Sequence, residues 1–85
     1  MNPGRALSRA RRGGVRNLDF ADFVRLLEGF GFRLDRIRGS HHVFCRTDLA
    51  LRVVVQPSRG EAKPYQVRQL LALVDEYNLR LETTP

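Results

Sequence analysis

Two histidines stand side by side in this chain, directly after a glycine and a serine, in the segment Gly39-Ser40-His41-His42. Histidine suits the cleavage of RNA, because an ordinary pKa of about 6.5 leaves much of it neutral and basic at pH 7. It can take the proton of a ribose 2′-hydroxyl, which then attacks the adjacent phosphorus and displaces the 5′-oxygen. The product is a 2′,3′-cyclic phosphate, and a nearby cation must stabilise the phosphorane charge. His41 and His42 are therefore the candidate catalytic residues.

Basic side chains before and after this segment can supply that cation. Arginine is well suited, because its charge is permanent and its planar fork matches a phosphate group. We expect RNA to be bound by the Gly39-Ser40 turn and by the following side chains: Arg36, Arg38, Arg46, Arg52, Arg59 and Lys63. Tyr65 either stacks on a base or supports a loop against the sheet, and both interpretations remain open.

Two other chemistries fit the sequence poorly. Adjacent histidines followed by Cys45 do not have the spacing of zinc ligands on a strand. Ser40 has no arrangement of acidic partners typical of a hydrolase triad. We therefore expect neither a metal site nor a cofactor.

The histidines must be positioned by a small set of helices and strands. Helices are predicted over residues 20–30, with Asp19 as N-cap and Gly31 as a left-handed stop, and over residues 64–78, where Pro64 suits the first turn. In each helix, apolar residues recur at i, i+3, i+4 and i+7. These residues are Phe20, Phe23, Val24 and Leu27 in the first helix, and Val67, Leu70, Leu71 and Val74 in the second.

Three strands are predicted between the helices, over residues 32–38, 41–46 and 51–56. The order αβββα indicates an α+β fold, in which two helices pack on one face of a three-stranded antiparallel sheet. The double-stranded-RNA-binding domain (dsRBD) has the same order. Neighbours on a strand point to opposite faces, so the two histidines cannot both line one site unless Gly39-Ser40 forms a bulge. One is therefore the candidate base, and the other is structural or exposed. Periodicity alone does not decide which.

The 85 residues suffice for one domain, and the net charge of +6 favours a polyanionic partner. Five of the fifteen basic residues and none of the nine acidic ones lie in residues 1–18, so the remainder is nearly balanced. We expect residues 1–17 to be a disordered basic segment, which is either an arm for RNA phosphates or foreign to the native protein. Residues 18–81 form the domain and residues 82–85 a tail.

The chain has one cysteine, which suits a reducing compartment, and no apolar run of about 18 residues. Its arginine-rich start lacks the apolar segment of a secretory signal. We therefore expect a cytoplasmic protein with no membrane partner.

Three segments together resemble the HicA family of toxins. They are Leu27-Glu28-Gly29-Phe30-Gly31-Phe32, Arg38-Gly39-Ser40-His41-His42-Val43-Phe44, and Lys63-Pro64-Tyr65-Gln66-Val67-Arg68, the last of which is similar to a subgroup of HicA-like sequences. The resemblance implies a dsRBD-like fold and metal-independent cleavage of mRNA. It also implies a HicB-like antitoxin that binds and blocks the active face.

The family's catalytic histidine maps best onto His41, although members differ in which of the two positions carries it, so His42 remains a candidate. Common HicA proteins carry another histidine after a proline beyond the third strand. Here the corresponding segment, Val55-Gln56-Pro57-Ser58-Arg59-Gly60, has none. The alternative function is therefore a non-catalytic RNA-binding or protein-interaction domain of dsRBD-like fold.

Overall fold

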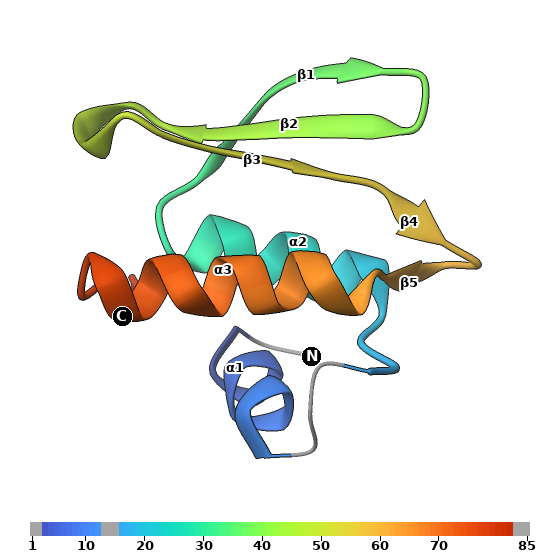
Figure 1. Cartoon of the computed structure of the whole chain (residues 1–85), viewed down its shortest axis with the longest axis horizontal. Coiled ribbons are helices and arrows are strands. Elements are labelled where there is room, and N and C mark those ends of the chain that lie inside the picture. Colours follow the sequence, from blue (N-terminus) through green and yellow to red (C-terminus); the bar gives the residue numbers. More distant parts are fainter. Residues whose placement is uncertain (1–2, 13–15, 83–85) are drawn as a thin grey trace.

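The computed structural model describes residues 3–12 and 16–82 and arranges them in three layers (Figure 1). A three-stranded sheet lies on top, α2 and α3 lie beneath it, and α1 packs below these two helices. The elements in chain order are α1 (Pro3–Arg12), α2 (Phe20–Gly29), β1 (Arg33–Arg38), β2 (His41–Arg46), a 3-10 turn (Thr47–Leu49), β3 (Leu51–Val55), β4 (Pro57–Ser58), β5 (Glu61–Ala62) and α3 (Pro64–Glu76).

The predicted α+β fold is confirmed, with a three-stranded antiparallel sheet in the order β1-β2-β3. We call the side of this sheet that faces α2 and α3 the inner face, and the opposite side the outer face. The inner face carries Phe44 opposite Val53 and His42 opposite Val55. Alternation places Val43 and Val54, which also oppose each other, on the outer face.

The core fills the space between the inner face and the helices. Its fully buried members include Phe23 and Leu27 of α2, Val67 and Leu70 of α3, and Val53 of β3. Each of these helical residues lies on an apolar stripe that the sequence indicates. Burial of one such side chain contributes about 1.5–3 kcal/mol relative to its exposure to water, so this packing fixes the sheet on the helices.

Helix α2 ends where Gly31 was expected to stop it. Gly31 has a φ of +88°, and its N–H donates to the carbonyl of Glu28, while the N–H of Phe32 donates to the carbonyl of Leu27. This pair of bonds is the Schellman motif, which favours glycine at the left-handed position. The motif turns the chain sharply from α2 into β1.

The expectation of disorder is not met for residues 3–12, which form the helix α1. Ala6 and Ala10 lie one turn apart and are buried in the same core as α2 and α3. Alanine has a high helix propensity and allows close approach, so a short apolar stripe suffices despite the arginines. Residues 1, 2 and 13–15 of the predicted arm, and 83–85 of the predicted tail, lie outside the described residues.

Residues 57–63, between the third predicted strand and the second predicted helix, contain a small hairpin of β4 and β5. Its turn uses positive φ angles at Arg59 and Gly60. The hairpin is tied to the start of α2, because Ala62 N–H donates to the carbonyl of Leu18 over 2.8 Å and Phe20 N–H donates to that of Gly60 over 2.9 Å. It thereby connects the end of β3 to both helices beneath the sheet.

Candidate active site

A two-residue turn, Gly39-Ser40, joins β1 to β2 and places the first histidine at the start of β2. Arg38 and His41 pair directly across the strands on either side of it. Gly39 has a φ of +58°, and a Cβ at this position would meet no heavy atom within 4 Å. The turn therefore needs glycine for its backbone conformation rather than for space.

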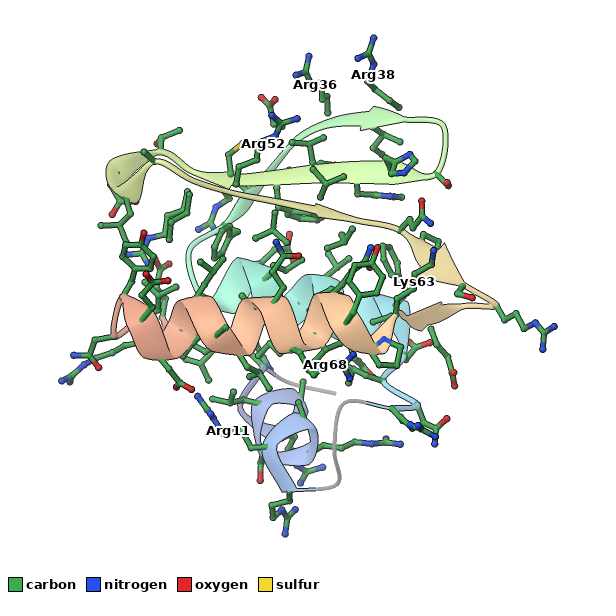
Figure 2. All side chains as sticks on the ribbon, viewed as in Figure 1. Arg11, Arg36, Arg38, Arg52, Lys63 and Arg68 are labelled. Atoms are coloured by element: carbon green, nitrogen blue, oxygen red, sulfur yellow. The ribbon has the colours of Figure 1, made fainter. Side chains whose placement is uncertain are left out.

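His41 is exposed on the outer face, and two arginines of β1 lie next to it. Arg38 is its direct partner across the strands, and Arg36 opposes Val43, which places Arg36 diagonally across from His41. Direct cross-strand partners have Cβ atoms about 4.5–5.5 Å apart. Both guanidinium groups project away from the helices, on the open side of the sheet (Figure 2). The imidazole of His41 is thus flanked by permanent positive charge.

Arg52 extends this basic surface toward the other end of the sheet. It opposes Cys45, which lies four residues beyond His41, or about 13 Å along the strand. Among the described residues, the side chains of Arg38 and Arg52 have no ion pair or hydrogen bond, and that of Arg36 has only a 3.7 Å contact with Asp35. These cations are free to bind an anion.

His42 points to the inner face, as strand alternation requires. Its ring is half-buried, with its centroid 5.2 Å from that of Phe20 at an interplanar angle of 65°. Its Nδ1 lies 3.1 Å from the carbonyl oxygen of Ser40, which can accept a hydrogen bond when Nδ1 carries the proton. These contacts give His42 a packing role on the side opposite His41.

A chain of polar contacts links the Gly39-Ser40 turn to α3. Ser40 Oγ lies 3.5 Å from Gln56 Oε1, and the Gln56 backbone N–H donates to Gln66 Oε1 over 3.2 Å. Gln66 Nε2 in turn donates to the hydroxyl of Tyr65. Gln66 is 2% exposed, and among the described residues it is the one polar side chain buried in the interior. Sequence reasoning missed both glutamines, since no local pattern reveals a contact between residues ten apart.

Arg46 lies on the inner side of β2, away from the other predicted RNA-binding arginines. Its Nη1 donates to the carbonyl oxygen of Phe30 over 2.9 Å, and its Nε donates to the Asp48 carboxylate over 3.1 Å. The side chain therefore satisfies an acceptor at the C-terminal end of α2, where a cation is favourable.

The remaining predicted RNA-binding residues do not lie on the outer face of the sheet. Arg59 is in the β4–β5 turn, while Lys63 and Tyr65 are at the start of α3. Tyr65 lines a shallow pocket with Arg16 and Arg68. The structure thus groups His41, Arg36, Arg38 and Arg52 on one surface, which we call the basic face. Arg59, Lys63 and Tyr65 lie apart from this face.

Within residues 3–12 and 16–82, no group of three His, Cys, Asp or Glu side chains could hold a metal ion. In the same part of the chain, no helix has both the length and the apolar character needed to cross a membrane.

Comparison with known protein families places the chain in one of them. The model of the family described as the HicA toxin of bacterial toxin–antitoxin systems matches residues 20–75, from the start of α2 almost to the end of α3. No curated protein and no solved structure matched the chain. The matched region covers well over half of the chain and includes the whole sheet, the Gly39-Ser40 turn and both histidines. The chain therefore belongs to the HicA toxin family.

Proposed function

We propose that this protein is the toxin of a type II toxin–antitoxin pair and that it cleaves mRNA in the cytoplasm without a metal ion. HicA proteins act in toxin–antitoxin pairs, so family membership supports the toxin role and an antitoxin partner. The observation that carries the catalytic part of the proposal is the pairing of exposed His41 with Arg38 on the basic face.

In this mechanism, RNA lies along the basic face with one phosphate between Arg38 and Arg36. Neutral His41 takes the proton of the 2′-hydroxyl, and the 2′-oxygen attacks the phosphorus. The two guanidinium groups stabilise the additional negative charge of the phosphorane. The bond to the 5′-oxygen breaks, and that oxygen takes a proton from solvent, to which the face is open. A 2′,3′-cyclic phosphate and a 5′-hydroxyl result.

Arg52 binds a second phosphate further along the same strand of RNA. The arginines of the basic face lie on an open surface, and His41 is itself exposed. Such a surface is accessible to an extended single strand, in which the 2′-hydroxyl can align with the scissile bond. We therefore propose single-stranded regions of mRNA as the substrate.

The test compares wild type, His41→Ala and His42→Phe on a labelled RNA oligonucleotide in EDTA. We expect His41→Ala to lower the cleavage rate by at least about 100-fold, in the range of general acid–base catalysis. His42→Phe retains an aromatic ring against Phe20, so its cleavage rate should stay within about threefold of wild type. Equal losses in both variants, with both still folded by circular dichroism, would contradict the role of His41.

A second candidate function is RNA binding without cleavage. It is supported by the placement of the histidines, because His41 is the one titratable imidazole on the basic face and no second one can protonate the leaving oxygen. Salt-dependent binding of RNA by the wild-type protein, with intact RNA in both EDTA and magnesium, would establish this function instead.

A further inference from the structure

An open apolar groove lies between α2 and the inner side of β1. Phe20 and Val24 line it from α2, and Leu34 and Ile37 line it from β1, with Phe44 between them. Leu34 is 47% exposed and Ile37 is 53% exposed, although both lie on the inner face opposite Phe44 and His42. The helices therefore cover β2 and β3 but leave the apolar side of β1 open to solvent.

β1 is also an edge strand of the sheet. It pairs with β2 on one side, and no other described strand pairs with it on the other. All six of its residues are exposed. Natural sheets protect their edges with charges or bulges, and β1 has a bulge between Leu34 and Arg36. Two exposed aliphatic side chains beside a free edge nevertheless indicate a binding surface, because an extended segment can add to the edge while its side chains fill the groove.

The charges of β1 indicate what kind of segment fits. Arg36 and Arg38 project from its outer side, and Arg38 has no described ion partner. A second copy of β1 added to this edge would bring its own arginines beside these two, and like charges in neighbouring strands are destabilising. Acidic residues at the same positions would be stabilising. The edge therefore favours a partner strand that carries carboxylates on its outer side.

We propose that the β1 edge and the α2–β1 groove bind an extended segment of the antitoxin, in which apolar residues fill the groove and alternating acidic residues lie beside Arg36 and Arg38. This inference rests on the toxin role proposed above and adds the docking surface and its chemistry. The bulge between Leu34 and Arg36 interrupts the strand, so the apolar anchors supply most of the affinity. The acidic residues pair with the arginines that RNA would otherwise bind, so docking of the antitoxin also inhibits RNA binding.

The test measures binding of the purified HicB-like antitoxin by calorimetry. Ile37→Ser removes an apolar anchor, and Leu49→Ser makes the same kind of change at an aliphatic residue that is 38% exposed in the turn between β2 and β3, outside the groove. We expect antitoxin affinity to fall at least tenfold for Ile37→Ser and to remain unchanged for Leu49→Ser. Leu34→Ser, at the second exposed anchor, should reproduce the loss.

Three outcomes would overturn the proposal. The first is equal antitoxin affinity in Ile37→Ser and Leu49→Ser. The second is an Ile37→Ser protein that loses binding because it is unfolded, while Leu34→Ser is folded and binds normally. The third is a wild-type dimer that Ile37→Ser dissociates. The last would assign the groove to a second copy. RNA cleavage is measured in parallel, because selective loss of antitoxin binding in a protein that never cleaves RNA would refute the nuclease while supporting the docking surface.

Discussion

Arg38 and His41 stand directly opposite each other at the end of the β1–β2 ladder, separated along the chain only by the Gly39-Ser40 turn. Because a two-residue turn fixes their register, the guanidinium and the imidazole are held on one surface without help from a loop. The proposed mechanism uses this pair as the base and the charge-stabilising group at one phosphate.

The first prediction concerns Arg38 as the group that stabilises the phosphorane. Arg38→Ala should lower the single-turnover cleavage rate by about 100-fold, the typical effect of removing one group that stabilises transition-state charge. Arg38→Lys retains the charge but loses the planar fork, so an intermediate rate is expected. An Arg38→Ala protein that cleaves RNA at the wild-type rate would exclude this role.

The second prediction separates phosphate contacts from charge in general. Arg52→Ala should weaken RNA binding, and the slope of log affinity against log salt should become shallower by about 0.7, the value for one phosphate contact on a single strand. The matched control is Arg11→Ala, since Arg11 pairs with Asp75 over 2.9 Å on the opposite side of the helices (Figure 2). If both variants change the slope equally, binding is not confined to the basic face.

The third prediction concerns the buried glutamine beneath the turn. Gln66→Leu leaves the Gln56 N–H without its acceptor, so the free energy of unfolding should fall by about 1–3 kcal/mol. Gln69→Leu changes an exposed residue of the same helix and should alter the stability by less than about 0.5 kcal/mol. Urea denaturation measures both values. Similar stabilities for the two variants would show that the buried contact contributes little.

The fourth prediction concerns the conformation of Gly39. Gly39→Ala should destabilise the fold by about 1–2 kcal/mol, because a residue that carries a Cβ is strained at a φ of +58°. Gly39→Asn should cost less, since asparagine visits this region more readily. Thermal unfolding compares the two variants. Since a Cβ at this position contacts nothing, a larger loss for asparagine would mean that side-chain polarity matters rather than backbone strain.

Much of the fold could be predicted from the sequence where apolar periodicity is strong. The stripes of α2 and α3, the β-branched residues of β3 and the stop at Gly31 each correspond to an observed element. α1 could not be predicted, because its two buried alanines provide little apolar signal among the arginines. Its stability depends on tertiary contact with α2, which amino-acid composition alone does not predict.

The site was predictable only in part. Strand alternation separates His41 from His42, and the structure agrees. Which ring is exposed could not be read from the sequence, because each side of β2 mixes polar and apolar residues. The contacts of Arg46 and Gln66 depend on elements that are distant along the chain. Such contacts are set by packing rather than by local pattern.

The edge-to-face contact between Phe20 and His42 also has a spectroscopic consequence. An aromatic ring shifts the resonances of protons held close to it, so the imidazole signals of His42 should be displaced from those of solvent-exposed His41. With only two histidines in the chain, each ring then gives its own resolved NMR signal without isotope-selective labelling. The proposed RNA contact at His41 can therefore be tested directly, with His42 as an internal reference in the same molecule.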